Sequence, residues 1–324
     1  MRRWGWQRWA VGLLAIAIAS EFALRWGFGL GNPVLLQADP ALGYRFQPDQ
    51  DLRRFGNRIR YNQYSQRSEP PLEPRSPDQA RILLTGDSVL NGGTLADQSE
   101  TIPAYMAAIW TAQGQSVELL NASAGSWGLG NQLAYLQTFG FFDSDLLIIF
   151  VGTHDLVQPT STSAVVGNHP DFPSRRPLLA WQELWTRYLW RRYLQPRWWR
   201  WRSQPLLPPP EPPTAAVLEA QVMKNLQALA AMVQLARQQQ VAVMVVYTPN
   251  LLDVWGDDPQ PPYKSALQAQ LQALAVPLAD VHEAWRYRFW REVEPFFRDS
   301  THLTPLGNRA VAQVRSRNSV GRAD

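Results

Sequence analysis

Five short apolar runs constrain the fold of this chain more than any other feature. They cover residues 82–85, 117–120, 146–151, 241–247 and 276–278. Runs of this length without polar alternation are typical of strands that are buried on both faces of a parallel sheet. Helical patterns separate them, most clearly at residues 102–113 and 215–240. The alternation predicts an α/β fold, a three-layer α/β/α sandwich in which helices cover both faces of a parallel sheet of about five strands.

The composition supports a folded core and points to no cofactor. Hydrophobic residues make up 45% of the 324-residue chain, which is enough for one large domain or two small ones. The net charge is +4, but nearly all basic residues are arginine, and we infer no nucleic-acid partner from it. The absence of cysteine excludes disulfides and thiol nucleophiles. The four histidines lack metal-ligand spacing and no nucleotide fingerprint is present, so neither a metal nor another cofactor is expected.

The N-terminus carries a basic flank followed by an apolar helix. Arg2, Arg3 and Arg8 precede an apolar run that extends from residue 9 to residue 20. This order is typical of an export or anchoring signal whose basic end stays in the cytoplasm. We therefore expect residues 1–30 to form a membrane anchor or signal segment. The rest of the chain is then expected outside the cytoplasm, on the periplasmic or extracellular side.

Three interpretations of this segment stay open, of which an uncleaved single-span anchor is favoured. Trp9 and Trp26 would lie about 26 Å apart along a helix, close to the thickness of the hydrocarbon layer. Glu21 and Arg25 are one helical turn apart and can neutralise each other near the outer interface. The run is also short enough for a cleaved signal peptide, with residues 17–19 as the cleavage site. The third interpretation is a buried helix of a soluble protein.

Two segments differ from the alternating pattern. Residues 31–80 are rich in Pro, Asn, Gln and Arg, which predicts an extended lead-in packed along a main domain at residues 81–318. Within that domain, residues 160–213 form an insertion that interleaves Trp with Arg and ends in a Pro-rich spacer. The insertion is predicted to be a cap on the domain, a helix on the membrane surface, or the lining of a groove for a sugar polymer. Its aromatic members are Trp181, Trp185, Trp190, Trp198, Trp199 and Trp201.

A serine at the end of the first apolar run gives the strongest functional signal. Gly86, Asp87 and Ser88 stand where open α/β sheets usually place their reactive groups. A serine hydroxyl is a weak nucleophile at neutral pH, so it needs an imidazole base and a carboxylate that orients the ring. Asp299 and His302 lie three residues apart near the other end of the chain and can supply both groups. Together these residues predict a Ser-His-Asp triad.

Two middle motifs also follow predicted strands. Residues 121–128 contain small residues through which backbone N–H groups can approach a ligand. His154 and Asp155 follow the third apolar run. Each motif taken alone could be a turn, but four strand-end motifs in this order are much less expected by chance than any single one.

On these motifs the chain resembles the SGNH (GDSL-type) hydrolases, over roughly residues 81–158 and 240–318. The resemblance implies a flavodoxin-like sandwich with a parallel sheet of about five strands, preceded here by the N-terminal transmembrane helix. It also implies roles for the predicted triad. Ser88 would be the nucleophile, His302 the base and Asp299 the acid that orients the base.

The resemblance further implies an oxyanion hole. Its donors would be the backbone N–H of Ser88, that of Gly125 and the side chain of the third motif, which is His154 where the family has asparagine. A neutral histidine can donate one N–H as an asparagine amide does, so an active enzyme with an altered hole is favoured over an inactive one. A spacing counted from Asn121 would place the family glycine at Ser126 instead.

The expected activity is acetyl ester chemistry on an acylated small molecule or on an envelope or extracellular polysaccharide. The lead-in resembles the extension found in membrane-anchored bacterial members of the family, some of which are linked to exopolysaccharide acetylation. Ester hydrolysis and O-acyl transfer to a sugar hydroxyl use the same residues, so both stay open. The alternative is a non-catalytic glycan-binding or scaffold subunit of an envelope assembly that retains the fold.

Overall fold

The computed structural model describes residues 3–71, 75–194, 212–255 and 260–314, and its centre is a five-stranded parallel sheet. The strand order is β6-β5-β7-β8-β9. Leu83 of β5 pairs with Leu120 of β6 on one side and with Leu147 of β7 on the other. The predicted parallel sheet is therefore confirmed, with strands at β5 (Ala80–Gly86), β6 (Val117–Ser123), β7 (Leu146–Gly152), β8 (Ala242–Thr248) and β9 (Leu278–Asp280).

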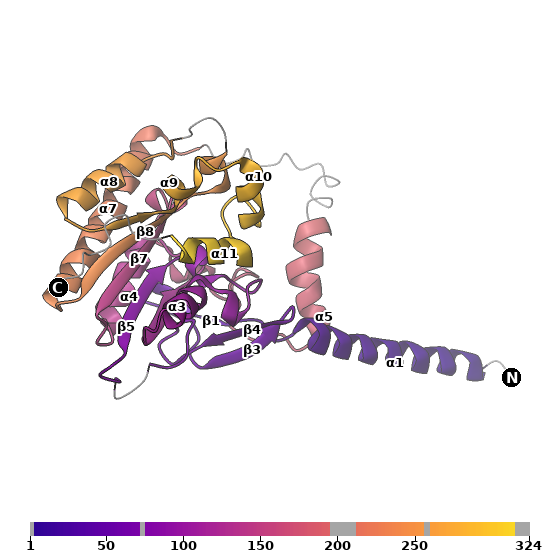
Figure 1. Cartoon of the computed structure of the whole chain (residues 1–324). Helices are drawn as coiled ribbons and strands as arrows, with labels where there is room; N and C mark the ends of the chain where they lie inside the picture. The colour runs from indigo at the N-terminus through magenta and orange to yellow at the C-terminus, as the bar shows by residue number, and fades with distance from the viewer. Residues whose placement is uncertain (1–2, 72–74, 195–211, 256–259, 315–324) are drawn as a thin grey trace.

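Helices cover both faces of this sheet, because alternate residues of each strand point to opposite sides. Leu83 and Leu147 pack in one core with α4 (Leu129–Phe139), α7 (Ala215–Gln238) and α8 (Lys264–Ala273). The neighbouring Leu84 and Ile148 pack in a second core. That core includes residues of α3 (Ile102–Ala112), α9 (Val281–Trp285) and α11 (Pro305–Ala312), and Figure 1 shows the resulting layers.

Short helices fill the connections between these elements. They are α2 (Ser88–Asn91), η1 (Gln98–Glu100), η2 (His154–Leu156), η3 (Ser163–Val165), η5 (Leu251–Val254), α10 (Trp290–Val293) and η6 (Glu294–Phe296). Several helices begin at a side chain that satisfies a free backbone N–H. Thr101 caps α3 and Thr304 caps α11, each followed within two residues by a proline that suits the first turn.

The lead-in forms two β-hairpins where the sequence predicted an extended segment. They pair β1 (Leu36–Asp39) with β2 (Gly43–Phe46) and β3 (Gln50–Arg54) with β4 (Asn57–Tyr61). Phe55 and Gly56 both have positive φ at the tight turn of the second hairpin. The buried side of both hairpins joins the core that contains α4 and α7. The hairpins therefore extend the hydrophobic core of the main domain.

Helix α1 (Arg3–Phe28) projects away from the domain (Figure 1). The part from Trp6 to Phe28 is long and apolar enough to cross a membrane, and none of its most apolar window is buried in the protein. The helix stops at Gly29, which has a φ of 70°. A Cβ atom at Gly29 would lie 2.1 Å from the backbone oxygen of Arg53, so only glycine fits where the helix meets the β3 strand.

The start of the insertion is joined to the end of α1. Helix α5 (Ala180–Glu183) continues into the π-helical segment η4 (Leu184–Leu194), and residues 195–211, including Trp198, Trp199 and Trp201, lie outside the described residues. Glu183 accepts hydrogen bonds from Arg54 at 2.5 Å and from the backbone N–H of Gly31 at 2.7 Å. Arg54 also donates to the backbone oxygen of Gly29 at 2.8 Å. One buried ion pair thus links α1, the lead-in and the insertion.

This ion pair generates a stability prediction. The side chains of Arg54 and Glu183 are 0% and 5% exposed. Glu183→Gln leaves the Arg54 charge buried without its counterion, so we expect a loss of about 3–5 kcal/mol in the free energy of unfolding. Urea unfolding of the full chain in detergent measures it. Glu219→Gln, at an exposed position of α7, is the matched control and should cost less than about 0.5 kcal/mol. Equal losses in the two variants would contradict the role of the pair.

Candidate active site

Ser88 lies at the turn where β5 ends and α2 begins. Asp87 caps this helix by accepting a hydrogen bond from the backbone N–H of Val89 at 2.9 Å. Gly86 is packed tightly, because a Cβ atom there would lie 2.9 Å from the side chain of Leu90 and 3.0 Å from that of Phe150. The tight turn leaves the Ser88 hydroxyl at the carboxyl edge of the sheet, with its backbone N–H in the first turn of a helix.

His302 approaches Ser88 from a loop 214 residues further along the chain. Its Nε2 lies 2.9 Å from the Ser88 Oγ, and its Nδ1 lies 2.8 Å from a carboxylate oxygen of Asp299. Asp299 also accepts backbone N–H bonds from Thr301 and His302 at 2.9 and 2.7 Å. The structure therefore brings together the three residues of the predicted triad.

The charge of Asp299 determines the direction of these hydrogen bonds. Partial burial acts to raise the pKa of Asp299. Hydrogen bonds from His302 and from the backbone N–H of Thr301 outweigh burial and lower this pKa. An ionised Asp299 can only accept, so Nδ1 of His302 carries the proton. Nε2 is then left to accept the hydrogen bond from the Ser88 hydroxyl, which is the arrangement a general base requires.

His154 faces the same edge of the sheet but is engaged with other partners. Its Nε2 lies 2.7 Å from Asp87 Oδ2, and its Nδ1 lies 3.2 Å from Asn250 Oδ1. Burial acts to lower the pKa of His154, but the hydrogen bond to Asp87 and the charges of Asp155 and Asp87 raise it to about 9. His154 is therefore a cation at neutral pH that donates both N–H groups. The predicted donation to an oxyanion would require it to release one of them.

Three buried or half-buried groups lie together behind Ser88. Asp87, His154 and Asp155 place ligand-type atoms within 4.8 Å of one another, a spacing that could hold a metal ion. In the structure they form an ion pair and a hydrogen-bond network. Burial acts to raise the pKa of Asp87, but the hydrogen bond and the charge of His154 outweigh burial and lower this pKa. Burial and the charge of Asp87 raise the pKa of Asp155 well above its usual value. Asp87 is thus the carboxylate that pairs with the His154 imidazolium, at 2.7 Å.

A cavity of about 490 Å³ opens over Ser88, His154 and His302. Both Gly125 and Ser126 line it, so the two alternatives for the second oxyanion donor lie at the same wall. Ser126 has a φ of 61°, a left-handed backbone conformation that glycine adopts without strain. Other parts of the chain complete the lining, namely Leu36, Phe46, Ser88, His154, Gln158, Asp171, Phe172, Thr301 and His302.

Several residues at this site were missed from the sequence. Asn250 lies two residues after the end of β8, as His154 does after β7, so the strand-end rule that identified His154 could have found it. The sequence does not predict that Asp87 binds His154, because the Gly-Asp-Ser motif by itself indicates a role only for Ser88. Leu36 and Phe172 carry no sequence signal, because their place in the cavity depends on how the lead-in and insertion pack on the domain.

The fold and site together define a serine esterase-type enzyme on a three-layer α/β sandwich. The chain belongs to the GDSL-like lipase/acylhydrolase family, whose model matches residues 84–310. This confirms the resemblance to the GDSL-type hydrolases, and the chain is an enzyme of that class. A comparison with curated proteins finds no match.

Solved structures of similar proteins include an acetyl xylan esterase and proteins of the G-D-S-L family. The crystal structure of TesA is 15% identical, with a TM-score of 0.44 over 72% of this chain and 93% of the other. A G-D-S-L family protein of Desulfitobacterium hafniense is 12% identical, with a TM-score of 0.43 over 72% and 97%. A variant of Axe2, an acetyl xylan esterase of Geobacillus stearothermophilus, is 13% identical, with a TM-score of 0.41 over 72% and 92%.

The cationic state of His154 generates a pH prediction. Its pKa in the folded protein is about 9, above its usual value of 6.5. The stabilisation from its proton is therefore fully present below about pH 6.5 and is lost as pH rises through about 9. We expect the advantage of the wild type over His154→Asn in free energy of unfolding to shrink across this range. Urea titrations at each pH measure it.

Nuclear magnetic resonance gives an independent check of the same pair. The imidazole signals of His154, assigned by their loss in His154→Asn, should titrate near pH 9. Titration near pH 6.5, with a constant stability difference between wild type and variant, would contradict the ion pair with Asp87.

Proposed function

We propose that this protein is a serine-dependent ester hydrolase or O-acyltransferase in which Ser88, His302 and Asp299 form the catalytic triad. The observation that carries the proposal is the unbroken series of hydrogen bonds from Ser88 Oγ to His302 Nε2 at 2.9 Å and from His302 Nδ1 to Asp299 at 2.8 Å. This series supplies the base and the orienting acid that a serine hydroxyl needs to act as a nucleophile.

The proposed reaction has two half-reactions that use the same base. Ser88 Oγ attacks the acyl carbonyl while His302 Nε2 takes the hydroxyl proton, and Asp299 stabilises the imidazolium. His302 then gives this proton to the leaving alcohol oxygen, and an acyl-enzyme remains on Ser88. Water or a sugar hydroxyl then attacks the acyl-enzyme while His302 takes its proton, and His302 returns this proton to Ser88 Oγ as the acyl group leaves. The acceptor alone decides between hydrolysis and transfer.

The proposed oxyanion hole lies between the start of α2 and the loop after β6. The backbone N–H of Ser88 is one donor, since it lies in the first turn of a helix. The second donor is a backbone N–H of Gly125 or Ser126, and the positive φ of Ser126 favours this residue as the counterpart of the family glycine. The imidazolium of His154 adds positive charge at the cavity wall, while its N–H groups stay bound to Asp87 and Asn250.

The proposed substrate is an acetylated small molecule or polysaccharide outside the cytoplasm. The cavity of about 490 Å³ has space for a small acyl group and part of its carrier. Helix α1 fits an uncleaved anchor, because residues from Ser20 onward continue the same helix into the domain and take part in its hydrogen bonds. The basic flank at Arg8 would keep the N-terminus in the cytoplasm.

Hydrolysis of p-nitrophenyl acetate by the full chain tests the triad. We expect Ser88→Ala to lower kcat/KM by about 10⁴-fold, because it removes the hydroxyl that is hydrogen-bonded to His302. Asp299→Asn should lower it by about 10²- to 10⁴-fold. Ser163→Ala, at an exposed serine of η3, is the matched control and should retain wild-type activity. Equal rates in the folded wild type and Ser88→Ala would contradict the triad, and rates equal to uncatalysed hydrolysis in both would favour the non-catalytic glycan-binding or scaffold subunit.

A further inference from the structure

The helix formed by α5 and η4 exposes an aromatic face to the outside of the protein. Its inner side is fixed to the domain through Glu183, which is buried, and through Tyr188, which packs edge-on against Phe55. Large apolar side chains of this helix and of the two residues before it are exposed, with Leu178 at 88%, Trp185 at 49% and Trp181 at 43%. We call this set the aromatic face; it comprises Leu178, Leu179, Trp181, Trp185, Trp190 and Tyr193.

The aromatic face begins beside the apolar run of α1. Glu21 of α1 accepts hydrogen bonds from the backbone N–H groups of Ala180 and Trp181 at 2.7 and 3.2 Å and so caps α5. The indole N–H of Trp181 donates to Ser20 Oγ at 2.9 Å. Arg25 pairs with Glu21 and donates to the backbone oxygen of Leu178 at 2.6 Å. Figure 1 shows that the helix rises across α1 and does not continue along it.

If α1 spans a membrane, the length of its apolar run determines how far along the helix the hydrocarbon layer extends. The 12 residues from Trp9 to Ser20 make only about 18 Å of helix, whereas the hydrocarbon layer is about 30 Å thick. A layer centred on this run extends about one helical turn beyond Ser20, past Glu21. The segment that contacts Ser20 and Glu21 therefore lies at the outer boundary of the lipid. Glu21 accepts hydrogen bonds there from Arg25 and from two backbone N–H groups, which offset the cost of a carboxylate near lipid.

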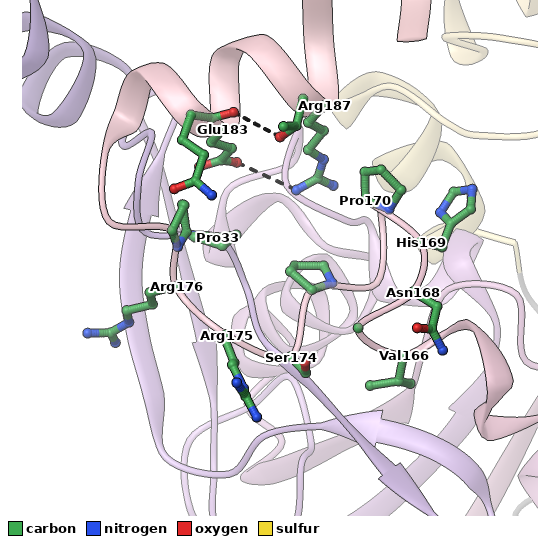
Figure 2. Close-up of a pocket in the computed structure, with 15 residues that line it drawn as sticks. Pro33, Val166, Asn168, His169, Pro170, Ser174, Arg175, Arg176, Glu183 and Arg187 are labelled. Atoms are coloured by element: carbon green, nitrogen blue, oxygen red, sulfur yellow. Dashed lines mark hydrogen bonds and ion pairs between the residues drawn. The ribbon is translucent and has the colours of Figure 1, made fainter. Parts of the chain in front are cut away.

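Two arginines shortly precede the aromatic face in the sequence. Arg175 and Arg176 are exposed, and within the described parts of the chain the side chain of neither makes an ion pair or hydrogen bond. They line a hollow of about 560 Å³ that Arg187 and Glu183 also border. Figure 2 shows the side chains of Arg175 and Arg176 pointing away from the Glu183–Arg187 ion pair. Segments that combine exposed arginines with exposed tryptophans are typical of the headgroup layer of a bilayer.

We propose that the aromatic face, with Arg175 and Arg176, lies in the outer surface of the membrane that α1 spans and binds the phosphates of lipid headgroups. The proposal rests on the anchor proposed above and is independent of the catalytic mechanism. It makes the insertion a second membrane contact, which holds the domain in one orientation. One loop, residues 169–173, borders both the catalytic cavity and the hollow. Asp171 and Phe172 line the catalytic cavity, and His169, Pro170 and Pro173 line the hollow. A single loop thus connects the proposed membrane contact with the catalytic cavity.

Spin-label accessibility in the full chain tests this contact. The chain has no cysteine, so a single introduced cysteine is the only labelling site. Leu178→Cys reports on the aromatic face, Ile16→Cys on the span, and Gln234→Cys, at an exposed position of α7, on water. In vesicles of phosphatidylcholine and phosphatidylglycerol, the ratio of collisions with oxygen to collisions with a water-soluble nickel chelate should be several-fold higher at 178 and 16 than at 234.

Each result of this experiment either supports or overturns the proposal. A label at 178 as accessible to nickel as the one at 234, with the label at 16 in lipid, overturns the membrane contact and leaves the anchor intact. Nickel access at 16 overturns both, while esterase activity still tests the triad separately. Arg175→Gln with Arg176→Gln should lower the ratio at 178 at least twofold, whereas the exposed Lys224→Gln should not. No change from the double substitution would overturn the role of the arginines in binding headgroups.

Discussion

Parallel pairing of the five sheet strands is the constraint on which the rest of the site depends. Because parallel strands all end at the same edge, residues that follow β5, β6, β7 and β8 must meet there. Ser88, Ser126, His154 and Asn250 come from these four strand ends. The loop with His302 arrives after β9 and is joined to the same edge by the hydrogen bond from the backbone N–H of Leu251 to the Ser300 oxygen at 2.9 Å. Distant parts of the sequence thus converge through backbone geometry alone.

The electrostatic arrangement separates two histidines that stand next to the same serine. His302 faces Asp299 on one side and Ser88 on the other, so its Nε2 is available as a base. His154 is fixed by Asp87 and Asn250, and its raised pKa keeps it charged. A cation behind the nucleophile lowers the energy of a developing oxyanion even without direct donation. The histidine in place of the family asparagine is therefore held in the site by the buried Asp87 and by Asn250.

The sequence predicts the sheet and the proximity of Ser88, Asp299 and His302, because apolar runs and strand-end motifs are local patterns with a known consequence in parallel sheets. It does not predict the two hairpins of the lead-in, whose buried residues alternate over only a few positions. Nor does it predict that Glu183 binds Arg54 or that Glu21 caps α5, because these contacts join segments more than 100 residues apart. Their partners are set by packing of the whole chain and not by any local pattern.

Covalent labelling of the full chain by a fluorophosphonate tests the central claim, that Ser88 is an activated nucleophile. A serine whose proton is accepted by His302 attacks the phosphorus and keeps the phosphonyl group, whereas an ordinary serine hydroxyl does not react. If Ser88 is activated, intact mass will show one adduct per chain, located on the peptide that contains Ser88, and none in Ser88→Ala. A folded wild-type protein that remains unlabelled, or an adduct on another serine, would contradict it.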